Sequence, residues 1–123
     1  MWWALWAAWI FVILGITVLP LENFVGHTHW DQVSWTPFFG HRLELYDIVG
    51  NMVMFIPFGY FLRRAATPRT RKRAWVLTLL LAAGVSTGLE FYQVFCHNRI
   101  PSTTDICSNF FGAIIGGLLS EST

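Results

Sequence analysis

Residues 46–73 read YDIVGNMVMFIPFGYFLRRAATPRTRKR, an apolar run that ends in a cluster of basic residues. The apolar part, 46–62, carries Asp47 and Asn51 near its start and Pro57 in its interior. At 1.5 Å per residue, a helix of this length crosses most of a hydrocarbon core about 30 Å thick. The stretch therefore predicts a membrane helix that is followed by a charged connection.

Three further apolar runs flank this one, at residues 2–20, 74–95 and 104–119. A cleaved signal peptide begins with basic residues. The first run has no charge before Glu22, so we interpret it as a retained anchor helix. The expected fold is a single domain over 1–123, an all-α membrane protein with a bundle of about four transmembrane helices.

The composition agrees with this interpretation, since 54% of the residues are hydrophobic and only 12% are charged. Soluble domains carry roughly 25% charged residues. Buried helices of a soluble domain are the alternative for runs 46–62 and 104–119. That alternative is disfavoured because no remaining stretch supplies a polar shell.

Six of the eight basic residues lie between positions 63 and 73, and no acid lies among them. These are Arg63, Arg64, Arg69, Arg71, Lys72 and Arg73. Cytoplasmic connections carry the excess of Lys and Arg. Four spans then place both termini in the cytoplasm and segments 21–45 and 96–103 outside. A basic run can also bind nucleic acid, but its position between two spans favours anionic lipid, and we expect no nucleic-acid partner.

This topology brings scattered polar residues to one depth near the outer ends of three predicted helices. They are Asp47, Asn51, Glu90, Gln93, Asp105 and Asn109, with Arg99 in the outer loop between them. Residues three or four apart share a helix face. We therefore predict a polar site just below the outer surface.

Each of these groups also has a structural interpretation. Asp47 and Asp105 are in places where acids cap helices or interact with the helix dipole. Asparagines in membrane helices often only join one helix to another. Glu90 is the strongest candidate, because a carboxylate deep in an apolar span is costly. Its structural alternative is an ion pair with Arg99.

Small residues in the last two runs indicate where helices approach closely. Gly84 and Gly88 are four apart, as are Gly112 and Gly116, a spacing typical of packed membrane helices. We therefore predict that the third and fourth runs pack tightly against each other. Pro57 removes the hydrogen bond to Val53 and is expected to kink the second run.

The second and fourth runs begin alike, with DIVGN at 47–51 and DICSN at 105–109. Both are expected to run from the outside inward. The pattern suits two helical hairpins related by a parallel repeat. Chance similarity between two short apolar runs is the alternative.

The blocks DIVGNMVMFIPFGYFL, STGLEFYQ and NRIPSTTDICSNFFGAIIGG together resemble the VanZ-like family of small membrane proteins. The resemblance covers about 46–119. It implies a bacterial cytoplasmic membrane protein of the cell envelope, in a family whose founding member is linked to resistance against teicoplanin. The family's motif positions fall on the polar residues above, together with Pro57, Gly59 and Gly112.

We consider two functions for the polar site. In the first, Asp47, Glu90 and Asp105 are catalytic, because crowded carboxylates share protons and act as acid and base. Alternatively they hold a divalent cation, which prefers oxygen ligands. The substrate would be a lipid-linked envelope precursor. The residues predicted to bind it are Asn51, Gln93, Arg99 and Asn109.

In the second, the site is a non-catalytic binder or modulator of an envelope partner. Its amides and charges suit a sugar or peptide, such as that of a lipoglycopeptide. The thin bundle is also compatible with an oligomer.

Two weaker hypotheses concern the outer segments. A Zn²⁺ ion could be bound by His27, His29 and Asp31, although the ligand spacing matches no recognised motif. His41 and His97 also fall outside. Cys96 and Cys107 would form a disulfide in an oxidising compartment, or remain buried thiols.

Overall fold

The computed structural model describes residues 1–39, 44–66 and 70–123, so predictions for His41 and Arg69 fall outside the described residues. The described residues form four α-helices and no strand. They are α1 (Trp2–Val18), α2 (Leu45–Ala65), α3 (Arg71–Gln93) and α4 (Thr103–Ser122). Two one-turn 3₁₀ helices, Leu21–Asn23 and Trp30–Gln32, lie between α1 and α2. The prediction of an all-helical fold is confirmed.

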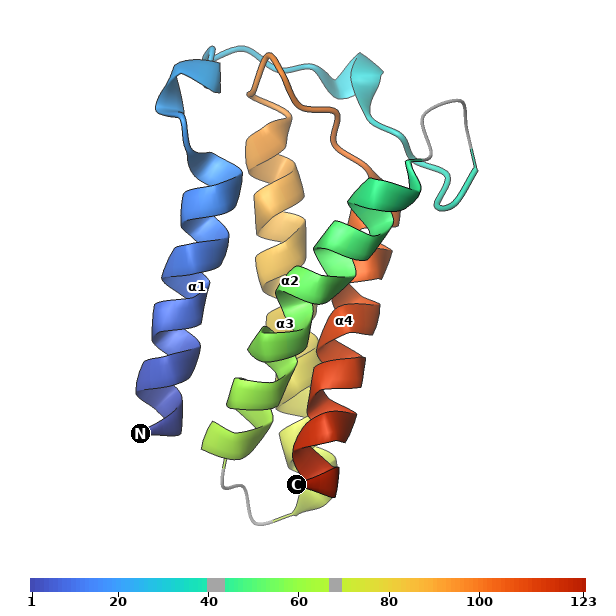
Figure 1. The fold of residues 1–123 in the computed structure, drawn as a ribbon. Helices are drawn as coiled ribbons and strands as arrows, with labels where there is room; N and C mark the ends of the chain where they lie inside the picture. Colours follow the sequence, from blue (N-terminus) through green and yellow to red (C-terminus); the bar gives the residue numbers. More distant parts are fainter. Residues whose placement is uncertain (40–43, 67–69) are drawn as a thin grey trace.

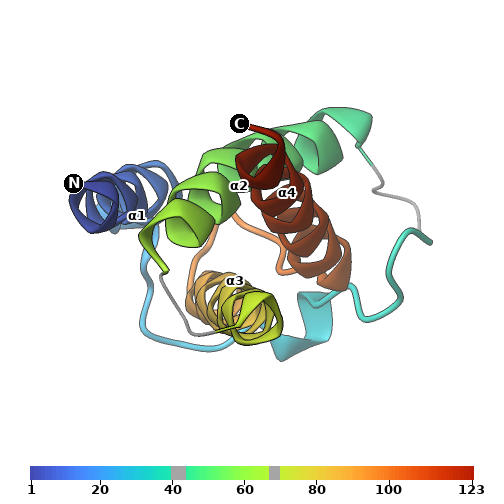
Figure 2. The same ribbon diagram turned by 90° about the horizontal axis from the view of Figure 1, so that it is seen from below.

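The helices lie lengthwise beside one another, and both chain termini are at the same end of the bundle (Figure 1). We call this end the basic end, because the last turn of α2 and the first turn of α3 also lie there and carry Arg63, Arg64, Arg71, Lys72 and Arg73. The opposite end carries the α1–α2 and α3–α4 connections (Figure 1). Seen along the bundle, α1 lies at one edge beside α2, while α2 and α3 both contact α4 (Figure 2).

Two of the helices, α2 and α3, are long and apolar enough to cross a membrane. α1 is apolar as well but has 17 residues. Many large apolar side chains are exposed on the bundle, for example Phe11 at 75% and Leu80 at 66%. A surface of this kind suits lipid better than water. Four complete spans therefore remain a prediction, supported so far by two helices.

The basic segment 63–73 differs from the prediction that it forms one connection. Arg63 and Arg64 belong to the last turn of α2, and Arg71 begins α3. Basic side chains at the end of α2 interact favourably with the helix dipole. Thr70 caps α3, because its hydroxyl accepts a hydrogen bond from the Arg73 N–H at 3.3 Å. The connection is therefore much shorter than predicted.

α2 and α4 run in the same direction and make the closest helix contact of the bundle. A Cβ atom added to Gly112 would lie 2.2 Å from the Met52 carbonyl oxygen. A Cβ on Gly116 would lie 1.9 Å from the Ile56 carbonyl oxygen. Gly59 approaches the backbone of α4 in the same way. Glycine is required at these positions because backbone meets backbone.

The prediction that the spaced glycine pair of α4 packs against α3 is therefore wrong. Gly112 and Gly116 pack against α2 rather than α3, and a Cβ on Gly84 or Gly88 would meet nothing within 4 Å. Both α3 glycines are exposed. The physical reason is that spacing of small residues marks a face that can be approached closely but does not identify the neighbouring helix. α2 itself continues as one helix through Pro57.

The buried core lies between all four helices, with Ala113 as the fully buried contribution of α4. It includes Phe55, Phe58 and Leu62 of α2, together with Ile13 of α1, all fully buried. α1 is further fixed by Trp9, whose indole N–H donates to the Met54 carbonyl oxygen at 2.9 Å. The Arg64 guanidinium, which lies 5.6 Å from the centre of the Trp2 ring, joins the same two helices near the basic end.

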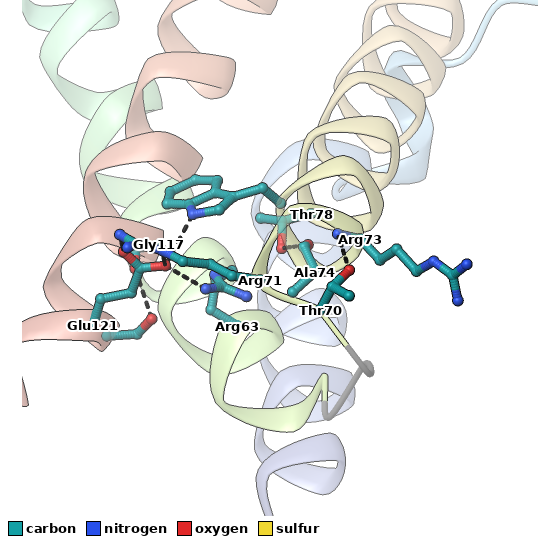
Figure 3. A network of polar contacts seen from close by, with 10 residues as sticks. Arg63, Thr70, Arg71, Arg73, Ala74, Thr78, Gly117 and Glu121 are labelled. Carbon is teal, nitrogen blue, oxygen red and sulfur yellow. Dashed lines mark hydrogen bonds and ion pairs between the residues drawn. The ribbon is translucent and has the colours of Figure 1, made fainter.

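Glu121 joins α2, α3 and α4 at the basic end (Figure 3). It forms ion pairs with Arg63 and Arg71, and it accepts a hydrogen bond from the indole N–H of Trp75 at 2.9 Å. The hydrogen bonds from Arg71 and then Arg63 lower the pKa of Glu121 to about 2. The carboxylate is therefore charged throughout the physiological range, and two of the basic side chains have an acid as their partner.

Candidate functional site

A polar cap closes the end of the bundle opposite the basic end. The chain between α1 and α2 lies over the α3–α4 connection (Figure 1). The Val25 N–H donates to the Phe95 carbonyl at 2.9 Å, and the Ser34 N–H donates to the Pro101 carbonyl at 2.9 Å. The Thr103 N–H donates back to the Ser34 carbonyl at 3.0 Å. The two connections therefore hold each other in place.

A cleft of about 1140 Å³ lies beside this cap, between α1, α2, α3 and α4. Five of the seven predicted site residues line it. They are Asp47, Asn51, Gln93, Arg99 and Asp105. Polar side chains from segments far apart in the sequence therefore share one cavity.

The charged groups of the cleft lie near one another. Asp105 lies in the first turn of α4, close enough to Asp47, Asn51 and Arg99 to interact with them. Among the described residues, no ion pair within 4.0 Å joins Arg99 to an acid. Asp47 and Arg99 are exposed, whereas Asn51 and Asp105 are half-buried. The charges of the cleft are thus available to a ligand.

Neither aspartate caps its helix, which corrects the capping part of that structural alternative and leaves the interaction with the helix dipole. Glu44 is the N-cap residue of α2 and Ser102 that of α4. Asp47 and Asp105 lie in the first turns instead, where carboxylates interact favourably with the helix dipole. Their side chains do not need to bond the helix ends, so they remain free to face the cleft.

Glu90 does not line the cleft. It has 6% of its surface exposed, and its Oε2 atom accepts a hydrogen bond from the backbone N–H of Ser102 at 2.7 Å. This satisfies a donor at the start of α4. The alternative ion pair with Arg99 is absent from the described residues, because the carboxylate is engaged by backbone. Glu90 therefore positions the turn that carries Asp105.

Asn109 is also buried beneath the cleft, with 2% of its surface exposed. Its amide donates to the Ser86 hydroxyl at 2.9 Å and thereby joins α4 to α3. Its carbonyl oxygen has no hydrogen-bond partner among the described residues. The arrangement matches the structural alternative in which an asparagine links two helices.

The geometry gives no support to a metal centre. The described residues contain no group of three or more His, Cys, Asp or Glu side chains that could hold a metal ion together. This applies to the three site carboxylates and to the outer histidines, although the His27 and His29 rings are 4.7 Å apart. Cys96 and Cys107 are free thiols, so the structure contains no disulfide between them.

Sequence reasoning missed one wall of the cleft, which comes from α1. Trp9, Ile16 and Thr17 line it, opposite Val53 and other residues of α2. α1 is apolar on every side, so no periodicity marks the face that meets the cleft. The cleft is consequently amphipathic, with charges near the cap and apolar side chains deeper between α1 and α2.

The VanZ/LLP1 family model matches residues 3–121, which include all three sequence blocks and every predicted site residue. No curated protein and no solved structure matches the chain. The match extends the resemblance seen in the sequence to almost the whole chain, and with it the chain belongs to the VanZ/LLP1 family.

Proposed function

We propose that this chain is a multi-pass protein of the bacterial cytoplasmic membrane that binds or modifies an amphipathic, lipid-linked or cell-wall-related molecule at the outer surface. Family membership and two apolar helices support the membrane location. The last turn of α2 and the first turn of α3, which carry Arg63, Arg64, Arg71, Lys72 and Arg73, lie at the same end as both termini (Figure 1). This supports cytoplasmic termini by the positive-inside rule. The cleft then lies at the outer surface.

The observation that carries this proposal is the amphipathic lining of the cleft. Charged and amide side chains lie near the cap, and Trp9, Ile16 and Val53 extend the lining between α1 and α2. A ligand with a polar head and an apolar tail satisfies both parts. A purely polar ligand would make no use of the apolar wall, so an amphipathic ligand fits the lining better.

Two roles for the polar groups follow from their positions. As an enzyme, the chain would use Asp47 and Asp105 as acid and base, because both face the cleft. Glu90 would then hold the α4 turn rather than contact the substrate. As a non-catalytic binder, the same groups would hold a ligand such as teicoplanin or an envelope precursor through hydrogen bonds and charge.

The test is expression in a teicoplanin-sensitive bacterium, with measurement of teicoplanin susceptibility and of envelope lipid precursors. The natural chain is expected to change at least one of these. Asp105→Asn keeps the shape of the side chain but removes its charge, so it is expected to abolish the change. Asp31→Asn is the matched control, because Asp31 is an exposed acid outside the cleft. An equal effect of both variants at equal membrane level would refute the proposal.

The two measurements, of lipid precursors and of susceptibility, distinguish the two roles. If a precursor accumulates or disappears only with the natural chain, the chain is an enzyme. If susceptibility changes while every lipid species stays constant, the binder is favoured.

A further inference from the structure

The charges that line the cleft indicate which head group a ligand would carry, and they do so more closely than the shape of the cleft does. Among the described lining residues, three are acidic and one is basic. Glu44, Asp47 and Asp105 are the acids, and Arg99 is the base. Because potentials at binding sites are complementary to those of their ligands, this lining favours a head group that carries a positive charge.

Gln93 provides an independent indication that a polar ligand belongs here. Its side chain lines the cleft although only 8% of the residue is exposed. Among the described residues, no side-chain hydrogen bond to Gln93 is found, while its backbone carbonyl accepts from the Cys96 N–H at 3.0 Å. A ligand group in the cleft can form hydrogen bonds with this amide, because its side chain lines the cavity.

We infer that the cleft takes an amphiphile whose head group combines a primary ammonium with a phosphate, as in an aminophospholipid. An ammonium has three N–H donors, and the cleft offers acceptors on Asp47, Asp105 and Gln93. Among the described lining residues, Arg99 supplies a cation suited to the phosphate, since guanidinium binds phosphate through paired hydrogen bonds. The acyl chains follow the apolar wall. This inference rests on the proposed function and deepens it by naming the ligand class.

The experiment compares three lipids with identical acyl chains on the purified full chain in detergent micelles, with dissociation constants measured by native mass spectrometry. Phosphatidylethanolamine has the ammonium with its three donors. Phosphatidylcholine keeps both charges but has no N–H donor, and phosphatidylglycerol has no cation. We expect phosphatidylethanolamine to bind at least about tenfold more tightly than phosphatidylcholine, because hydrogen bonds between charged groups are lost in the latter. Phosphatidylglycerol is expected to bind weakest.

Conservative variants locate the binding. Asp47→Asn and Asp105→Asn are each expected to weaken phosphatidylethanolamine binding about tenfold and to leave phosphatidylcholine less affected. Arg99→Gln should weaken both lipids alike, because both have the phosphate. Asp31→Asn, with an unchanged lipid preference, is the control.

The outcomes separate this inference from the proposed function. Equal binding of phosphatidylethanolamine and phosphatidylcholine, or tightest binding of phosphatidylglycerol, would overturn the head-group assignment while an amphiphile still occupies the cleft. If no lipid binds, or if no cleft variant alters binding, the head-group assignment also fails, whereas the proposed function is decided separately by the teicoplanin and precursor measurements with Asp105→Asn. The comparison among lipids uses the natural chain, so it does not depend on the folding of any variant.

Discussion

Replacing Gly116 by alanine places one methyl group between α4 and α2. The added Cβ would lie 1.9 Å from the Ile56 carbonyl oxygen and 2.8 Å from the Tyr60 nitrogen, where ordinary contact begins at 3.4 Å. Both neighbours are backbone atoms, so no side-chain rotation relieves the contact. The two helices must therefore separate along the interface that holds Asp47 and Asp105 near each other.

The magnitude follows from two opposing effects. Overpacking a tight interface costs about 1–3 kcal/mol, and this contact with backbone belongs at the upper end. Alanine is favoured over glycine within a helix by about 1 kcal/mol, which offsets part of the cost. We expect the free energy of unfolding to fall by about 2 kcal/mol in Gly116→Ala.

The matched control is Gly84→Ala, which also replaces a glycine within a helix. Its Cβ would meet nothing within 4 Å, so the variant should gain about 0.5–1 kcal/mol from helix propensity alone. Both variants are measured by titrating the purified chain from mild detergent into SDS while following tryptophan fluorescence. Equal stability of the two variants would refute the close α2–α4 packing.

Three other predictions concern residues at the two ends of the bundle. Glu90→Ala leaves the Ser102 N–H without its acceptor and should cost about 1.5–3 kcal/mol in the same titration, whereas Glu90→Gln, which keeps an acceptor oxygen, should cost less. A loss of stability in Glu90→Gln equal to that in Glu90→Ala would show that the charge matters more than the hydrogen bond. The lowered pKa of Glu121 means that its contribution to stability is complete above its usual pKa of 4.5 and is lost as the pH falls toward about 2. Glu121→Gln should therefore flatten the dependence of unfolding on pH in this window, and an unchanged slope would contradict the ion-pair network. A phosphatase that is active only outside the cytoplasm should be inactive when fused after Thr123 and active when fused after Asn98; the reverse pattern would invert the proposed topology.

The helices themselves could be predicted from the sequence, because hydropathy is a local property and four apolar runs stand out. The residues at which the helices begin and end were harder to predict. Arg63, Arg64 and Arg71 were assigned to a connection because they are charged, yet arginine is a good helix former and extends both helices. Charge identifies what water or head groups contact, but it does not mark where a helix stops.

The contacts between segments could not be predicted in the same way. The partner of Glu90 is a backbone N–H, which every residue except proline carries, so no side-chain pattern points to Ser102. The cap depends on backbone hydrogen bonds between two irregular segments, such as that from Ser34 to Pro101. Side-chain patterns could identify polar residues at one depth, but not which of them face the cleft.

The two D-x-x-x-N blocks show how the surroundings give similar sequences different roles. α2 and α4 run in the same direction and touch, so Asp47 and Asp105 reach the same cleft. Their asparagines diverge, because α2 also faces α1 while α4 faces α3 (Figure 2). Asn51 lines the cleft, whereas Asn109 is buried against Ser86. If a parallel repeat gave rise to both blocks, the two asparagines have since taken different roles. Asn51→Ala should therefore impair ligand binding, whereas Asn109→Ala should chiefly impair stability.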